Sequence, residues 1–481
     1  MNILSEVLKY DVFPALGCTE PIAVAYAASA AGKQLDGEVS EIHISVDPGV
    51  YKNGFAVAIP NTGGERGNLI AGVLGALIQR PELKMEIMSC VTEEILSRAK
   101  TLIQQHRADI SCDRSKRLLY IDVFLRAEKD SARAVIEGSH TNLVRLEHND
   151  RVLLQSNEAL YRASDNDFRT ALRNTSIAKL VDMAGQIEQQ DYDYIKRGID
   201  MNLRICKEGH SLRRVGHYIS ELVVKKQRED SIFSSCEVMT SSAVDARMGG
   251  LNLPVMSSGG SGNQGIVAIL VPYLVGKHYD LEEGVIVRSI ALAHLINSYI
   301  KCFTGDLSPL CGCAIAAGVG AAVAIVYQRA GKDMPKITLA ANNLISDLGG
   351  MLCDGAKEGC ALKVASSTNS AIRSAHMALN NHGITQMEGF VGTTAEDTIR
   401  NLSQIGAIGM SLANDTMLNI MIEKSSGQTD SEESMILNKD NLHDHNKPDA
   451  GDENLPKESG HQNITKGKGA RSPLDLCKKY H

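Results

Sequence analysis

The chain has 481 residues, enough for two or three domains, and its 43% hydrophobic and 22% charged composition is ordinary for a soluble globular protein. A formal net charge of −7, with no basic stripe carrying interleaved aromatic residues, argues against a nucleic-acid-binding protein. The N-terminal sequence MNILSEVLKYDVFPALG lacks the basic segment and apolar run of a secretory signal. Together with 11 cysteines, an odd number, this predicts a cytoplasmic protein with reduced thiols.

An Ala-rich helix is predicted at residues 20–31, after a short helix that ends near Pro14. Pro21 is acceptable in the first turn of this helix, because an N–H group at that position would have no carbonyl partner within the helix. Cys18 and Thr19 therefore lie at the start of this helix, where the helix dipole favours an anion and lowers the pKa of a thiol. A buried cysteine beside an N-capping threonine explains the same position equally well, so position alone leaves both interpretations open.

Alternating residues in the first third of the chain predict a small sheet. Residues 38–60 predict a hairpin with Ile42, Ile44 and Val46 on one face. The Gly-rich run NTGGERGN at residues 61–68 is interpreted as a connecting turn. Antiparallel strands are predicted at residues 118–126, 132–137 and 143–148, and helices at residues 69–79 and 93–106.

Helical periodicity replaces alternation from about residue 165. The sequence predicts an α+β protein: a small mixed or antiparallel sheet with helices in residues 1–165, a mainly α-helical catalytic domain in residues 166–424, and a disordered tail in residues 425–481. The tail mixes charges of both signs and is too polar to offset the entropy of ordering. Later helices are predicted at residues 209–228, 236–249, 283–302, 311–330, 336–346, 366–380 and 395–406.

Residues 307–328 carry no charge and are long enough to span a membrane. They include Ser308, Pro309, two cysteines and several small residues, and no similar stretch accompanies them. We therefore expect a buried helix here, and no membrane partner.

Three segments are richer in Gly, Ser and Asn than packing requires: residues 254–265, 353–360 and 364–374. The first leads into an apolar helix, whose free N–H groups could bind a carboxylate. The third is expected to be a loop that opens a helix. A capped helix explains each segment singly, but together they indicate a small-anion site in the helical domain.

Five cysteines lie close together in the sequence: Cys302, Cys311, Cys313, Cys353 and Cys360. Their spacing matches neither the paired knuckles of a four-thiolate zinc site nor a ferredoxin run. Irregular thiolates from separate loops favour an iron–sulfur cluster with one iron free to act as a Lewis acid. A zinc site and a set of plain buried thiols remain alternatives.

Five segments carry a resemblance to a known family: ALGCTEP, SSGGSGNQG, LSPLCGCAIAAGVGA, MLCDGAKEGCALK and SSTNSAI. They resemble the L-cysteine desulfidase family, a serine dehydratase α-chain-like group of uncharacterised proteins, over residues 1–424. The helical domain more distantly resembles iron–sulfur L-serine dehydratases. GCTEP departs from the S-S-S-H-T motif of those enzymes, so Cys18 stands where they carry a proposed catalytic histidine. The last two cysteines are also closer together than in those enzymes.

The resemblance implies a [4Fe–4S] cluster with one open iron and no pyridoxal phosphate. Its implied ligands are Cys313, Cys353 and Cys360, with Cys311 or Cys18 as the alternative, and Cys302 as a packed thiol. Some of the dehydratases place a C-terminal cysteine on the resting cluster, but the sequence around Cys477 gives no sign of docking.

The implied reaction is β-elimination, which converts L-cysteine to pyruvate, ammonia and hydrogen sulfide. Cys18 is the predicted base. The alternatives are an L-serine dehydratase and, from another class, a non-catalytic cluster-binding sensor. The expected partner is a small amino-acid substrate, with a homo-oligomer left open. The predicted substrate-binding residues are Thr19, Ser257, Ser258, Asn263, Lys357, Ser366, Ser367 and Asn369.

Overall fold

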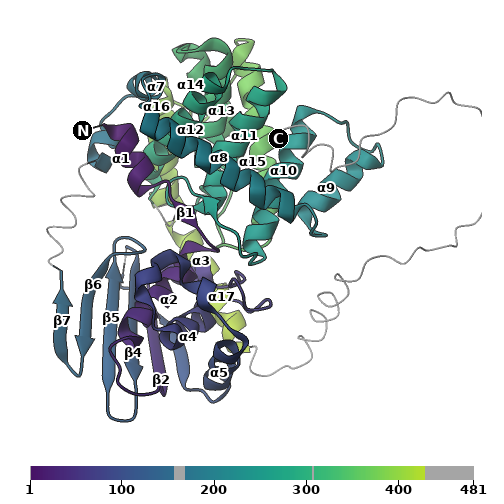
Figure 1. The fold of residues 1–481 in the computed structure, drawn as a ribbon. Coiled ribbons are helices and arrows are strands. Elements are labelled where there is room, and N and C mark those ends of the chain that lie inside the picture. The colour runs from purple at the N-terminus through teal and green to yellow at the C-terminus, as the bar shows by residue number, and fades with distance from the viewer. Residues whose placement is uncertain (1, 117, 157–167, 306–307, 428–481) are drawn as a thin grey trace, which may run out of the picture.

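The computed structural model describes residues 2–116, 118–156, 168–305 and 308–427 (Figure 1). It confirms the predicted α+β fold, with a mixed sheet near the N-terminus and a larger helical body after it. The predicted tail, including Cys477, lies outside the described residues from residue 428 onward. The proposed boundary near residue 165 also falls outside them and stays a prediction.

The sheet has six strands in the order β3-β2-β4-β5-β6-β7. Strand β2 is parallel to β3 and antiparallel to β4, and the remaining neighbours are antiparallel. The sequence predicted β4, β5 and β6 but missed β3 and β7. The strands are β2 (Glu41–Val46), β3 (Ala108–Cys112), β4 (Tyr120–Arg126), β5 (Ser131–Glu137), β6 (Leu143–His148) and β7 (Arg151–Gln155).

Two small-residue helices, α2 (Thr19–Gly32) and α4 (Asn68–Ile78), pack together in the core of this first part (Figure 1). Their backbones approach closely, because a Cβ atom on Gly75 would lie 2.1 Å from the Ala25 carbonyl oxygen. The Ala- and Gly-rich composition of both helices is what permits this contact. Other elements here are α5 (Glu93–Gln104) and the 3-10 segment η1 (Pro81–Cys90).

The predicted hairpin at residues 38–60 is wrong in its second half. Ile42, Ile44 and Val46 do share a buried face of β2, but the chain then forms α3 (Pro48–Gly54). Asp47 starts this helix by accepting hydrogen bonds from the Gly49 and Val50 N–H groups over 2.7 and 3.2 Å. An Asp cap followed by Pro is a helix-start signal that the alternating pattern concealed.

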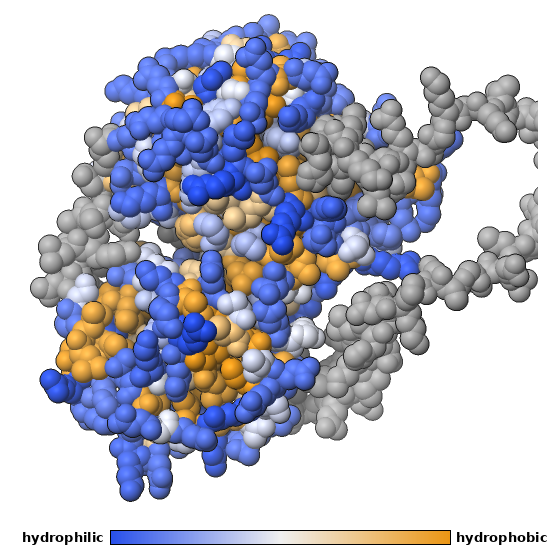
Figure 2. Space-filling model, viewed as in Figure 1, coloured by the Kyte–Doolittle hydropathy of each residue, from blue (hydrophilic) through white to orange (hydrophobic). Residues whose placement is uncertain are grey.

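The edge of the sheet at β7 is apolar and exposed. Val152, Leu153 and Leu154 are 44, 46 and 40% exposed. Figure 2 shows apolar side chains gathered at lower left, where Figure 1 places β6 and β7. An edge strand of this kind presents unpaired backbone groups on which another strand can add.

The helical body is built around α10 to α15, which share one large core. Helix α1 (Ile3–Tyr10), which the sequence placed in the first domain, packs into this core instead, through Leu4, Val7 and Leu8. The body contains α7 (Ile177–Gly185), α8 (Gln189–Gly209), α9 (Val215–Val224), α10 (Ile232–Met248), α11 (Gly262–His278), α12 (Glu283–Thr304), α13 (Ala316–Ala330), α14 (Met334–Leu348), α15 (Cys360–Leu379) and α16 (Ala395–Gln404).

Several predicted helix limits need correction. Residues 209–228 form the end of α8 and a separate α9. Helix α15 begins at Cys360, so residues 364–374 lie within a helix and are not a loop. The uncharged stretch ends in the buried helix α13, as expected. Among described single helices, α12 alone has the length and hydropathy of a membrane span, and 83% of that window is buried.

Several contacts join the two parts of the described chain. Strand β1 (Pro14–Ala15) pairs with β8 (Val255–Met256), just before the loop that leads into α11. Helix α3 contacts the turn after α14, since the Ala356 N–H donates to the Asn53 carbonyl over 3.3 Å. After the π-helical segment η2 (Ile405–Gly409), α17 (Ser411–Gly427) returns to α3 (Figure 1).

Candidate active site around four cysteines

Four cysteines meet where two turns of the helical body run side by side. Cys311 and Cys313 precede α13, Cys353 follows α14, and Cys360 is the first residue of α15. Backbone hydrogen bonds hold the turns together. The Cys311 N–H donates to the Met351 carbonyl over 2.9 Å, and the Cys353 N–H donates to a carbonyl of the first turn over 2.7 Å. Cysteines far apart in the sequence are thereby brought to one place.

The four thiols influence one another electrostatically. Cys311 accepts a hydrogen bond from Cys313, which lowers the pKa of Cys311 to about 6 and raises that of Cys313. Burial, and then the charge on Cys311, raise the pKa of Cys353, and burial raises that of Cys360 to about 11. One thiol of the four is therefore ionised near neutral pH, and the other three need a bound cation to lose their protons.

The sulfur atoms of the described residues do not form a closed tetrahedral zinc site. A tetrahedral zinc site holds its sulfurs about 3.8 Å apart. Among described residues, no three of these sulfurs lie within 4.8 Å of one another; the set of possible ligand atoms that meets this limit is Asp36, Asp130 and His148, in the sheet domain. A cluster separates its ligands, because each thiolate binds a different iron.

Two lysines that the sequence interpretation missed border the thiols. Lys52 of α3 is 2% exposed and donates to Asn414 Oδ1 over 2.7 Å. Burial lowers its pKa, and the nearby Cys353 opposes that shift. Lys363 donates to the Leu352 carbonyl over 2.7 Å and to an Asp354 carboxylate oxygen over 2.5 Å. Both cations favour thiolates at this site.

Lys357 and Cys302 both have partners within the protein. Lys357, a predicted substrate ligand, forms an ion pair with Asp354 of its own turn. The Cys302 thiol donates to the Arg169 carbonyl over 3.6 Å, as a packed thiol would.

Cys18 lies at the start of α2, as predicted, and is itself the N-cap residue, a role that was predicted for Thr19. Its pKa is raised and not lowered. Burial is the main cause, and the adjacent Glu20 carboxylate adds to it. The thiol donates a hydrogen bond to Glu20 Oε2 over 2.9 Å. The expectation of a resting thiolate base is therefore wrong, because a buried thiol beside a carboxylate keeps its proton.

Glu20 is a buried carboxylate that remains ionised. Burial alone would raise its pKa, but hydrogen bonding and the charge of His140 lower it well below its usual range. The Thr19 hydroxyl donates to Oε2 over 3.1 Å and the Asn53 side chain donates to Oε1 over 3.2 Å, while His140 Nε2 lies 3.8 Å from Oε1. Thr19, a predicted substrate ligand, thus supports this carboxylate. Glu20 could have been identified from the sequence as a candidate site residue, because it lies within the GCTEP motif.

Ser257 and Ser258, two predicted substrate ligands in the 254–265 loop, are hydrogen bonded to the protein. Ser257 Oγ accepts from the Phe13 N–H over 2.8 Å. Ser258 Oγ lies 2.8 Å from His294 Nδ1 and accepts from Asn297 Nδ2 over 2.9 Å. These buried hydroxyls fix the shape of the loop, which leaves its backbone as the part able to bind a ligand.

Arg247 of α10 connects this loop to the Cys18 segment. It donates to Asn263 Oδ1 over 3.0 Å and to the Gly17 carbonyl over 2.6 Å. The residue is 2% exposed. Arg247 was also missed, although it is the single basic residue in the predicted helix CEVMTSSAVDARMG.

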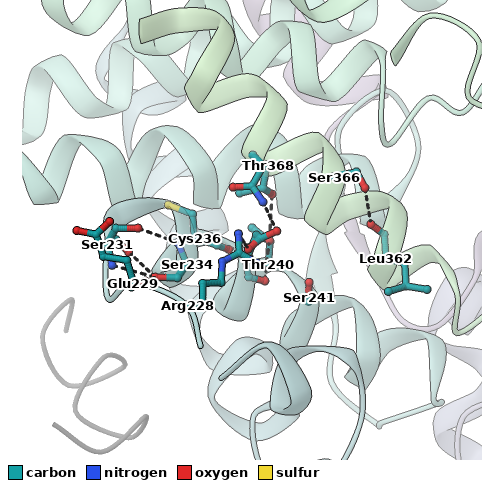
Figure 3. A network of polar contacts seen from close by, with 12 residues as sticks. Arg228, Glu229, Ser231, Ser234, Cys236, Thr240, Ser241, Leu362, Ser366 and Thr368 are labelled. Atoms are coloured by element: carbon teal, nitrogen blue, oxygen red, sulfur yellow. Dashed lines mark hydrogen bonds and ion pairs between the residues drawn. The ribbon is translucent and has the colours of Figure 1, made fainter. Parts of the chain in front are cut away.

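The predicted ligands on α15 all hydrogen bond within the protein, and two of the three do so to other segments. Ser366 Oγ donates to the Leu362 carbonyl over 3.1 Å, and Ser367 Oγ donates to the Ala314 carbonyl over 2.9 Å. Asn369 donates to Glu237 of α10. Figure 3 shows Thr368 on α15 facing Thr240 of α10, whereas Ser366 points to Leu362 of its own helix. Ser367 supports the cysteine turn, whereas Ser366 and Asn369 make contacts elsewhere on the helix.

Two series of contacts link Cys18 to the cysteine turns. On one side, Arg247 joins Gly17 to the start of α11, where Gln264 Nε2 lies 2.6 Å from the position that a Cβ on Gly312 would occupy. On the other side, Asn53 joins Glu20 to the turn between Cys353 and Cys360. The first part of the chain and the helical body therefore both contribute to one buried region.

Comparison with known proteins agrees with this arrangement. Residues 82–419 match the family described as Serine dehydratase alpha chain. A UPF0597 protein of Geobacter sulfurreducens is 58% identical over 426 residues, which cover 89% of this chain and 99% of that protein. Those of Elusimicrobium minutum and Clostridium tetani are 50 and 39% identical over 424 and 423 residues, covering 88% of this chain and 100 and 99% of the relatives.

The chain therefore belongs to the serine dehydratase α-chain family. Within that family it belongs to the UPF0597 proteins, whose names state no reaction.

Proposed function

We propose that the chain is an iron–sulfur-dependent lyase that converts L-cysteine to pyruvate, ammonia and hydrogen sulfide by β-elimination. The observation that carries this proposal is the meeting of four thiols from separate segments, with lysines beside them. The match to serine dehydratase α-chains supports the reaction type, because both reactions remove a β-substituent from a small amino acid.

The donor set fits a [4Fe–4S] cluster. Cys313, Cys353 and Cys360 would hold it, with Cys311 or Cys18 as the alternative ligand, and its open iron would supply a Lewis acid for the departing group. The reaction as proposed uses no pyridoxal phosphate.

Cys18 and Glu20 together provide a candidate base. Glu20 is ionised and accepts the hydrogen bond of the Cys18 thiol over 2.9 Å. Glu20 holds the Cys18 side chain in place through this hydrogen bond. Once the thiol proton has passed to solvent, the high pKa of Cys18 makes its thiolate a strong base, able to remove the α-proton of the substrate. The carbon–sulfur bond then breaks and hydrosulfide leaves. The remaining 2-aminoacrylate tautomerises to an imine, which water hydrolyses to pyruvate and ammonia.

L-Serine dehydration is the second candidate, favoured by the description of the matching family. The same residues would act, and hydroxide would leave in place of hydrosulfide. A non-catalytic sensor that uses the cluster to respond to iron or oxygen is the alternative from another class.

Product analysis separates these functions. Protein purified without oxygen is incubated with L-cysteine or L-serine, and sulfide and pyruvate are measured. We expect equal amounts of sulfide and pyruvate from L-cysteine, formed faster than pyruvate from L-serine. Faster turnover of L-serine would favour the dehydratase, and an iron-loaded protein inert toward both would favour the sensor.

We also propose a cytoplasmic location, where thiols stay reduced. The protein would bind a small amino-acid substrate and would bind neither nucleic acid nor a membrane. A homo-oligomer is proposed on the strength of the exposed edge strand β7.

A further inference from the structure

The first turn of α11 is buried and has no cap. Its N-cap residue, Ser261, makes no side-chain capping hydrogen bond. Within the described part of the chain, the N–H groups of Gly262, Asn263 and Gln264 have no acceptor, and these residues are buried. Buried backbone donors normally have partners, and a helix N-terminus attracts negative charge. The start of α11 is therefore suited to an anion.

A buried cation points to the same place. Arg247 hydrogen bonds to two neutral oxygens, those of Asn263 and Gly17, and its Nε atom is buried without a partner. No carboxylate of the described residues lies within 4.0 Å of its guanidinium nitrogens. Gly262 permits the close approach, because a Cβ there would lie 2.4 Å from Nε. A buried charge with no counter-ion is costly unless a ligand supplies one.

The position of this pair relates it to the proposed chemistry. Arg247 holds the carbonyl of the residue before Cys18. Gln264, in the first turn of α11, touches Gly312 between two of the cysteines, and its Oε1 atom is buried without a partner. An anion at the helix start would lie between the Cys18 segment and the cysteine turn.

We propose that Arg247 and the N–H groups at the start of α11 bind the α-carboxylate of the amino-acid substrate. This rests on the proposed function for the identity of the ligand. Guanidinium and backbone N–H donors suit the two oxygens of a carboxylate. Arg247 is thus a specificity-determining residue: it selects α-amino acids over the corresponding amines and amides.

The test uses L-alanine, which has the carboxylate but no leaving group, and L-alaninamide, which lacks the charge. Binding of each to the full-length protein is measured by calorimetry, before and after loading with iron. We expect L-alanine to bind and L-alaninamide to bind about 10- to 100-fold more weakly. Equal binding of the two, or no binding of L-alanine, would overturn the proposal.

Substitutions test whether Arg247 is the residue that binds the carboxylate. Arg247→Met should weaken L-alanine binding by about 10- to 100-fold, and Arg247→Lys by less, because lysine keeps the charge but loses the planar fork. Arg133→Met, which removes an arginine paired with Asp122 in the sheet, is the control and should bind L-alanine normally. Circular dichroism confirms folding. If Arg247→Met does not fold, two measurements still test the proposal. They are the binding of L-alanine by Arg247→Lys, and the comparison of L-alanine with L-alaninamide on the natural protein.

These experiments distinguish a failure of the carboxylate site from a failure of the proposed lyase function. Turnover of L-cysteine with an unchanged KM in Arg247→Met would overturn the carboxylate anchor and leave the lyase standing. Arginine-dependent binding of L-alanine by a protein that turns over neither amino acid would keep the anchor and overturn the lyase.

Discussion

Glu20 is a carboxylate kept ionised inside the protein by the donors around it. Its neighbours Cys18, Thr19 and Asn53 each donate a hydrogen bond, at 2.9, 3.1 and 3.2 Å. Together with His140 they outweigh the cost of burial. The resting site therefore stores its negative charge on Glu20 and its proton on Cys18, the reverse of what a helix N-terminus alone would predict.

The first prediction is that Glu20→Gln slows proton removal while leaving iron bound. The amide keeps the size of the side chain but removes the charge that holds the Cys18 thiol and raises its pKa, so the thiolate becomes a weaker base and kcat for L-cysteine should fall about 10- to 100-fold. Steady-state kinetics and iron content measure this. Asp245→Asn, a buried carboxylate whose Oδ2 accepts from the Gly216 N–H over 2.8 Å, is the control and should retain activity. A Glu20→Gln protein as active as the parent would remove Glu20 from the mechanism.

The second prediction concerns the buried His294, whose pKa is lowered by burial from 6.5 to about 3. The folded protein holds this ring neutral, whereas the unfolded chain protonates it below about pH 6.5. Stability from this group is thus present above pH 6.5 and is lost as the pH falls toward 3. The slope approaches about 1.4 kcal/mol per pH unit.

Urea unfolding at pH 7.0 and pH 5.0 tests this. His294→Gln, which cannot titrate, should lose less stability between the two values than the parent does. The difference between the two proteins isolates His294 from other groups, such as Asp245, whose pKa burial raises to about 7. Parallel losses would show that His294 is not responsible.

Among the elements, the close contact of α2 and α4 is the most sensitive to a change in volume. A methyl group on Gly75 would lie 2.1 Å from a backbone oxygen, which cannot move aside as a side chain can. The third prediction is that Gly75→Ala destabilises the protein by about 1–3 kcal/mol, despite the better helix propensity of alanine. Gly350→Ala is the control, since nothing lies within 4 Å of that added atom. Equal unfolding midpoints for the two variants would contradict the packing described.

Some of the helices and strands could be predicted from the sequence alone. Small-residue composition located α2 and α4, which are buried on nearly all sides. Periodicity located α5 and the antiparallel strands, because each buries one apolar face. The pattern failed where a local cap outweighed it: Asp47 and Pro48 begin a helix inside an alternating run. It failed again at α15, where residues 366–368 were interpreted as a helix opening although they lie within a helix. Ser367 and Thr368 use their hydroxyl groups in contacts with other segments.

At the scale of the whole molecule, the site depends on contacts between residues distant in sequence. The five cysteines could be grouped from sequence alone, because they are close in the chain. Arg247, Lys52 and Gln264 could not, since each becomes relevant only when α10, α3 and α11 meet the cysteine turns. A single sequence does not show which distant segments come into contact. The one available sign was an isolated basic residue in a buried helix.

The fourth prediction follows from the return of α17 to α3. Lys52 is held by Asn414 over 2.7 Å, beside Cys353. A chain that ends after residue 427 keeps this contact and should retain its iron. A chain that ends after residue 410 loses it, and we expect weaker iron binding because one cation near the thiolates is no longer held in place. Iron-to-protein ratios after gel filtration measure the difference, and equal ratios would show that α17 does not support the site.

Metal content and sulfide release, measured together on protein prepared without oxygen, test the central claim most directly. The natural protein is compared with Cys353→Ala and with Cys112→Ala, a cysteine of β3 in the sheet. The account predicts a brown, iron-containing protein that releases sulfide from L-cysteine, with both properties lost in Cys353→Ala and kept in Cys112→Ala. A colourless protein that holds zinc or no metal and releases no sulfide, or a Cys353→Ala variant with full iron content and activity, would contradict it.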